Sequence, residues 1–176
     1  MLTIFSFITK IETDFLLNWG CIPVYSSKIL KQIYSHSIEE YPFECCGCVF
    51  ETAHENHQII LPCKNIQNEL HESSPEENPR NARTAYTISP KDILIINRMA
   101  RDQNYRLKAI YHSHPDHKAY FSEQDYAMAT FDHEPMYPGT EYIIVSIINK
   151  KVKEAICFSW DNKSKGFLEG EILQTY

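Results

Sequence analysis

The sequence lacks any run of basic residues longer than the pair Lys150-Lys151. Its 176 residues carry 17 lysines and arginines against 23 aspartates and glutamates, which gives a formal net charge of −6. Proteins that bind the phosphate backbone of nucleic acids present clustered basic side chains. The missing cluster therefore argues against nucleic acid as a partner.

Long apolar runs are missing as well. A membrane-spanning helix needs roughly 18 or more consecutive apolar residues, and no segment provides them. The apolar N-terminus is interrupted by Lys10, Glu12 and Asp14 and has no basic region ahead of it, so it does not match a secretory signal peptide. We expect a cytoplasmic protein with no membrane segment, in which residues 1–20 form an N-terminal extension.

The six cysteines lack the spacing of a CxxC-type zinc site. Cys45, Cys46 and Cys48 are too close in sequence for the disulfide frameworks of small secreted domains. Because cysteine is among the most buried residue types, we interpret this cluster as small apolar side chains of a strand.

Internal repeats are absent, and a chain of this length buries one hydrophobic core, so residues 21–176 are expected to form a single domain. Helical and strand-like patterns alternate, which predicts an α/β fold with a mixed, curved sheet flanked by helices. The expected helices cover residues 26–41, 89–103 and 122–131. The expected strands cover residues 47–51, 58–63, 84–88, 107–114 and 141–148, and a closing hairpin covers 152–160 and 166–173. The polar stretch 64–83 is predicted to be a long loop.

The segment YHSHPDHKAYFSEQD concentrates potential metal ligands. Because side chains alternate along a strand, His112 and His114 should point to one side and Ser113 to the other. Ser122 and Asp125 are three residues apart at a helix start, so they share a helical face. If the helix start folds over the strand end, two imidazoles and one carboxylate converge. That is the ligand set of a catalytic zinc ion with a fourth position open for water.

Both halves of this segment have simpler interpretations. The residues SEQD also match a capping box, in which Ser122 and Asp125 satisfy backbone groups of their own helix. The two histidines of HSH could equally belong to a surface turn. The metal site is favoured because both coincidences would have to fall within one short window. His117 and His133 have no partner at ligand spacing and are expected in exposed loops.

Hydrolysis at a metal also needs a group that moves a proton. Glu44 is a candidate, because Tyr41 and Phe43 precede it and the apolar residues CCGCVF follow it. Such surroundings would raise the pKa of its carboxyl group toward the useful range. An exposed loop carboxylate is an alternative that the spacing alone does not reject.

Glu44, the H-S-H triplet, seven further residues and S-x-x-D together resemble the signature of the JAMM (MPN+) zinc metalloproteases. The surrounding segments YPFECCGCVF, YHSHPD and YPGTEYIIVSI are similar to compact bacterial members of that family. The resemblance runs from about Ile22 to Trp160, and it implies a cytidine-deaminase-like α/β fold.

The same resemblance implies a role for each residue of the signature. It implies that His112, His114 and Asp125 hold a Zn²⁺ ion. It also implies that Glu44 is the catalytic acid and base, and that Ser122 helps to hold the oxyanion.

The implied reaction is hydrolysis of a peptide or isopeptide bond after the C-terminal Gly-Gly of a ubiquitin-like or sulfur-carrier protein, for example to release cysteine or a short tail. Only about fifteen residues, 126–140, separate the metal aspartate from the next strand. The resemblance implies that deubiquitinating members carry insertions that bind ubiquitin, and this gap leaves little room for the second of them, which favours a sulfur carrier. A deubiquitinase-like isopeptidase, a phage-tail-type peptidase and a catalytically silent scaffold module stay open as alternatives. A non-haem iron site is disfavoured, because both histidines are adjacent and a separate glutamate is present.

An extended Gly-Gly tail is expected to add to the strand 84–88 through main-chain hydrogen bonds. The substrate-binding residues would then be Thr84, Ala85, Tyr86, Thr87 and Ile88. Residues 64–83 would form a lid over the tail. The sequence does not indicate an oligomeric state.

Overall fold

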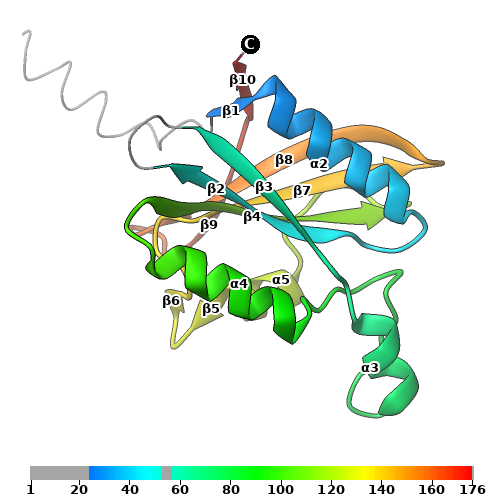
Figure 1. Ribbon diagram of the computed structural model, residues 1–176. Helices are drawn as coiled ribbons and strands as arrows, with labels where there is room; N and C mark the ends of the chain where they lie inside the picture. The colour runs from blue at the N-terminus through cyan, green and yellow to red at the C-terminus, as the bar shows by residue number, and fades with distance from the viewer. Residues whose placement is uncertain (1–23, 53–56, 176) are drawn as a thin grey trace, which may run out of the picture.

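A six-stranded mixed sheet forms the centre of the protein (Figure 1). The computed structural model describes residues 24–52 and 57–175, so the expected extension 1–20, Cys21 and most of the first hairpin turn lie outside the described residues. The strand order is β3-β2-β4-β7-β8-β9. Their bounds are β2 Cys46–Thr52, β3 Gln58–Cys63, β4 Tyr105–Pro115, β7 Glu141–Ile148, β8 Lys151–Asp161 and β9 Gly166–Gly170. Only β4 and β7 run parallel, so the predicted mixed sheet and its closing β8–β9 hairpin are confirmed.

Four helices accompany this sheet in the described part of the chain: α2 Ser27–Glu40, α3 Gln67–Ser73, α4 Pro90–Arg101 and α5 Glu123–Ala129. The three predicted helices, α2, α4 and α5, each begin after a serine, Ser26, Ser89 or Ser122, whose side chain accepts a hydrogen bond from a backbone N–H of the first turn. In Figure 1, α2 covers one face of the sheet, and α4 and α5 cover the other. None of the helices in residues 24–52 and 57–175 has the length and apolar character needed to cross a bilayer.

Two short strand pairs complete the described fold. β1 Val24–Ser26 pairs in parallel with β10 Leu173–Thr175, and β5 Thr130–Phe131 pairs with β6 Glu134–Pro135. The second pair occupies the connection between α5 and β7. His133 lies in its turn and is exposed, as predicted.

Side chains of β4 alternate between two hydrophobic clusters, one on each face of the sheet. Ala109 and Tyr111 pack under α2, whereas Ile110 packs in the cluster on the α4 face. His112 and His114 follow Ile110 at intervals of two, so they also point to the α4 face. The alternation of β4 thus delivers two imidazoles to one side of the sheet.

The five described cysteines are buried free thiols. Cys46 and Cys48 lie in β2, as the sequence predicts. Burial raises the pKa of the Cys45 thiol to about 11. A buried, protonated thiol is a small apolar side chain and a poor metal ligand or nucleophile.

The prediction of a strand at residues 84–88 is wrong. Only Ile88 pairs there, in an isolated bridge with Asn65. The Asn65 side chain bonds the C=O of Ala85 through Nδ2 at 3.2 Å and the N–H of Thr87 through Oδ1 at 3.1 Å. The Asn65 side-chain amide therefore pairs with the C=O of Ala85 and the N–H of Thr87, which in a strand would pair with the backbone of a neighbouring strand.

The prediction of a long loop at residues 64–83 is also wrong, because α3 lies within it. Gln67 Nε2 donates to the C=O of Arg80 at 2.8 Å, and the N–H of Ala82 donates to Asn68 Oδ1 at 2.8 Å. Polar side chains thus order this segment without an apolar periodicity. α3 itself projects away from the sheet (Figure 1).

Gly47 of β2 lies opposite Tyr111 of β4, and a Cβ at position 47 would lie 2.5 Å from the Tyr111 Cζ and Oη atoms. The ring has no room to retreat, because it is fully buried and its Oη lies 2.9 Å from His36 Nδ1. We expect Gly47→Ala to lower the free energy of unfolding by about 1–3 kcal/mol, measured by urea denaturation. Gly166→Ala is the control, because no atom lies within 4 Å of the added Cβ there. Equal stability of the two variants would contradict the close β2–β4 packing.

Candidate metal centre

Pairing of β2 with β4 brings the segment around Glu44 beside the two histidines. Cys46 lies opposite His112 in the antiparallel register. One residue earlier, the N–H of Cys45 donates to Ser113 Oγ at 2.9 Å, and the N–H of Ser113 donates to the C=O of Cys45 at 3.2 Å. Ser113, which points away from the histidines, therefore holds the start of β2 against β4, the strand that carries the histidines.

The backbone of Glu44 is held from its other side by the segment after α3. Its N–H donates to the C=O of Ala82 at 2.7 Å, and Asn65 Nδ2 donates to its C=O at 2.9 Å. These two bonds and the Cys45–Ser113 pair fix the position of Glu44 relative to the sheet.

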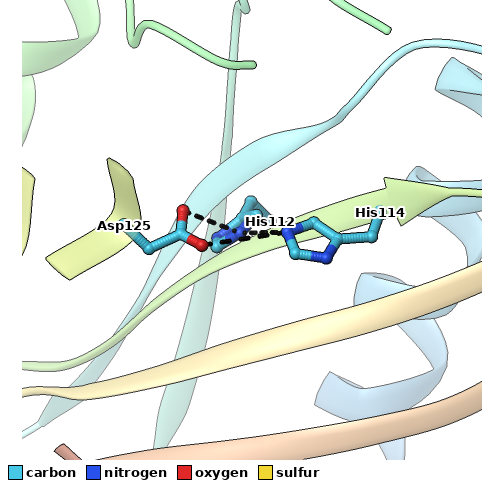
Figure 2. Close-up of side chains that lie close together, drawn as sticks. All are labelled: His112, His114 and Asp125. Carbon is cyan, nitrogen blue, oxygen red and sulfur yellow. Dashed lines mark hydrogen bonds and ion pairs between the residues drawn. The ribbon is translucent and has the colours of Figure 1, made fainter. Parts of the chain in front are cut away.

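His112, His114 and Asp125 converge between the end of β4 and the start of α5 (Figure 2). His112 Nε2 lies 3.2 Å from Asp125 Oδ1 and 3.1 Å from His114 Nε2, and His114 Nε2 lies 3.9 Å from Asp125 Oδ2. All three side chains are buried. One nitrogen or oxygen atom from each lies within 4.8 Å of the others, so the three could hold one metal ion.

Neighbouring groups orient two of these ligands. His114 Nδ1 lies 3.0 Å from the C=O of Lys118, which can only accept, so Nδ1 carries the proton and Nε2 presents a lone pair. The N–H and hydroxyl of Ser122 donate to Asp125 Oδ2 at 2.8 and 2.6 Å, and the N–H of Asp125 donates to Ser122 Oγ at 3.1 Å. The capping-box interpretation is therefore correct as well, and these same contacts leave Oδ1 of Asp125 facing His112.

The charges at the centre suit a cation. Burial opposes ionisation of Asp125, but His112 and Ser122 hold its pKa well below the usual range, so it is a carboxylate. Burial and the neighbouring His112 lower the pKa of His114 to about 4, so its imidazole is neutral at pH 7. Burial would lower the pKa of His112, yet Asp125 and Glu44 together raise it. A proton on His112 and a metal ion at the centre are therefore alternatives.

The donor set fits zinc. Two imidazole nitrogens and one carboxylate oxygen are a common protein ligand set for a catalytic Zn²⁺ ion. Among buried side-chain atoms of the described residues, only His112 Nδ1 has no hydrogen-bond partner. His112 is thus positioned by packing, with Tyr86 stacked on its ring at a centroid distance of 4.7 Å.

Glu44 is buried, with 6% of its surface exposed, so the alternative of an exposed loop carboxylate is wrong. Burial raises the pKa of its carboxyl group to about 7; the charge of Asp125 also raises it, while His112 and Arg80 lower it. A carboxyl group with this pKa can take up and release a proton near neutral pH.

An open cavity of about 310 Å³ joins these groups. The predicted site residues Glu44, Thr84, Ala85, Tyr86, His114, Ser122 and Asp125 line it. Thr87 and Ile88 do not line it, and His112 lies buried beneath Tyr86. The cavity wall also contains residues that the sequence did not point to: Arg80, Tyr120, Gln124 and Met128, together with the exposed His117. The sequence feature that could have indicated Tyr120, Gln124 and Met128 is their closeness in sequence to the ligands His114 and Asp125. For Arg80 it is the position within the polar stretch 64–83.

The family model for prokaryotic homologs of the JAB domain matches residues 26–163. The chain belongs to this family, which confirms the resemblance carried by the motifs. Membership supports a metal-dependent hydrolase or a scaffold role. No curated protein is significantly similar to the chain.

Two solved structures share the fold. A protein from Desulfitobacterium hafniense, solved in solution, is 18% identical with a TM-score of 0.62, covering 88% of this chain and 93% of its own. A protein from Salinibacter ruber is 20% identical with a TM-score of 0.53, covering 88% of this chain and 92% of its own. At these identities the likeness shows the fold alone.

We expect the protein to bind one zinc ion per chain, and His112→Ala to weaken binding by at least about ten-fold, because a three-ligand site loses one nitrogen donor. Equilibrium dialysis with metal analysis measures both. His117→Ala removes a histidine from the wall of the same cavity and should leave the affinity unchanged. Equal weakening by the two substitutions would contradict the assignment of ligands.

Glu44→Gln should stabilise the metal-free protein at alkaline pH. Between pH 4.5, the ordinary pKa, and about pH 7, the unfolded chain releases a proton that folded Glu44 keeps, so wild-type stability falls as the pH rises. We expect the variant to be more stable than wild type by about 2–3 kcal/mol at pH 8, with the difference disappearing toward pH 4.5. Urea denaturation with a chelator present gives both values. A difference independent of pH would mean that Glu44 has an ordinary pKa.

Proposed function

We propose that the protein is a zinc-dependent peptidase of the JAMM type. It would hydrolyse the bond after the C-terminal Gly-Gly of a ubiquitin-like or sulfur-carrier protein and release cysteine or a short tail. One observation carries the proposal: the buried carboxyl group of Glu44, with a pKa of about 7, lines the same cavity as His114 and Asp125. Burying an acid costs stability, and a scaffold module would gain nothing from it.

His112, His114 and Asp125 would hold the zinc ion, which when bound lowers the pKa of water and polarises a carbonyl group. Glu44 would take a proton from the attacking water molecule. It would then pass that proton to the amine of the leaving residue, so that one group serves as base and acid in turn.

Ser122 would hold the negative charge that develops on the substrate carbonyl oxygen. Its hydroxyl group donates to Asp125 Oδ2 at 2.6 Å, and Ser122 is one of the residues that line the cavity. In this proposal the hydroxyl turns from Asp125 toward the substrate during the reaction. The N–H of Ser122, which donates to the same Oδ2 at 2.8 Å, would keep Asp125 in place.

The segment Thr84–Tyr86 would bind the Gly-Gly tail, although it is not a strand. It lines the cavity, and no hydrogen bond joins the N–H or C=O of Tyr86 to another residue of the described chain. Both groups could therefore pair with the main chain of an extended tail. A cavity of about 310 Å³ is at the small end of ligand pockets, which suits glycines. Of residues 64–83, the segment expected to form a lid, only Arg80 lines the cavity. In this proposal the segment therefore contributes one residue to the cavity wall and does not cover the tail.

The zinc-loaded protein should trim carriers that end in Gly-Gly-Cys or Gly-Gly-peptide to Gly-Gly, followed by intact mass. Glu44→Gln should lower the rate by about 10²- to 10⁴-fold, the usual contribution of a positioned acid and base. The variant should still bind zinc, because Glu44 is not a ligand in this scheme. No cleavage of any such carrier by the native chain, or equal cleavage by the variant, would rule out the proposed mechanism.

A further inference from the structure

The segment after α3 places one arginine at the wall of the metal cavity. Arg80 lines this cavity together with Glu44, His114 and Asp125. No carboxylate among residues 24–52 and 57–175 forms an ion pair with it. Its positive charge is therefore available to a ligand in the cavity.

Helices α3 and α5 fix the position of this arginine. Gln67, a buried residue of α3, donates from Nε2 to the C=O of Arg80 at 2.8 Å. Arg80 Nη1 donates to Gln124 Oε1 at 2.7 Å and to the C=O of Thr84 at 3.4 Å. Gln124 immediately precedes Asp125 in α5. The guanidinium group is thus tied to the helical turn that carries a metal ligand.

The contacts of Arg80 leave one edge of its guanidinium group unused. Nη1 makes both hydrogen bonds, so Nε and Nη2 have no partner in the described part of the chain. These two N–H groups lie side by side, and together they match the two oxygens of a carboxylate. A lysine at this position would lack that planar pair of donors.

The charge and depth of the site favour an anion near Arg80. Glu44 and Asp125 are buried, whereas Arg80 is exposed, so the arginine lies nearer the mouth of the cavity than the reacting groups. With a divalent cation on the ligands, the carboxylates of Asp125 and Glu44 balance its charge, so Arg80 leaves the cavity with a net positive charge, although the whole chain has a formal charge of −6. An anionic substrate group a short distance from the cleaved bond would be stabilised there.

We propose that Arg80 binds the α-carboxylate of the residue that is cleaved off, so that the protein removes a single C-terminal residue as a carboxypeptidase. This inference rests on the proposed peptidase function. In the reaction the water oxygen bonds to the carbonyl carbon of the second glycine, and the C–N bond breaks. One water proton ends on the released amine, and the new carboxylic acid loses the other to solvent.

This assignment separates substrate classes. A single residue after Gly-Gly presents its free α-carboxylate next to the cleaved bond. An isopeptide bond to a lysine side chain places that lysine's backbone several bonds away, and a longer tail replaces the carboxylate with a neutral amide. The role of α3 follows as well, since it holds Arg80 at the cavity wall through Gln67.

The test measures binding rather than turnover. Zinc-loaded protein with Glu44→Gln is titrated with a fluorescent peptide ending in Gly-Gly-Ala, either as the free acid or as the C-terminal amide. We expect the acid to bind about ten-fold or more tightly than the amide, as a charge-assisted pair of hydrogen bonds provides. Adding Arg80→Gln should remove the difference by weakening the acid only. Arg83→Gln is the matched control, since that guanidinium carbon lies 5.7 Å from the centre of the Phe43 ring and does not line the cavity.

Equal binding of acid and amide, binding of neither peptide, or equal weakening of both by Arg80→Gln would overturn the inference. Loss of the preference in Arg83→Gln would do so too, because it would show a general charge effect. Cleavage of both peptides by the native protein is followed separately by mass. A binding preference without cleavage would support the carboxylate site at Arg80 but reject the proposed peptidase function. Equal cleavage of acid and amide would support the peptidase function but reject the carboxylate site at Arg80.

Discussion

The candidate centre depends on the antiparallel pairing of β2 with β4. The reciprocal hydrogen bonds between Cys45 and Ser113, at 2.9 and 3.2 Å, hold the residue after Glu44 against the residue between the two histidines. Gly47 permits this pairing, because any Cβ there would collide with the buried ring of Tyr111. A register shift of one residue would turn His112 and His114 to the opposite face of the sheet.

Three separate devices then complete the cavity. The serine cap of α5 brings Asp125 to the histidines with one carboxylate oxygen facing them. The side chain of Asn65 holds both the Glu44 backbone and the segment with Ala85, which lines the wall. The polar helix α3 supports Arg80. Each of these arrangements includes hydrogen bonds between a side chain and a backbone group, which is local in the serine cap and distant along the chain for Asn65 and Gln67.

The difference between local sequence signals and hydrogen bonds to distant residues explains how much the sequence could predict. The sheet, three helices, the buried cysteines and the shared direction of the two histidines follow from periodicity and from serine caps, which are local signals. The strand predicted at residues 84–88 failed because an asparagine some twenty residues earlier takes its backbone groups. The helix α3 and the place of Arg80 were missed because they depend on amide side chains such as Gln67, whose partners no local pattern reveals. Burial of Glu44 depends on the same long-range contacts, so spacing alone left it undecided.

The most direct test of the account is X-ray absorption at the zinc edge of the zinc-loaded protein, which reads the ligand atoms themselves. Coordination by His112, His114 and Asp125 predicts only nitrogen and oxygen neighbours, at about 2.0–2.2 Å, with imidazole scattering from two rings. His112→Ala should remove one imidazole from that pattern. A sulfur neighbour at about 2.3 Å would contradict the account, because it would place the metal on the cysteines that the fold buries as apolar side chains.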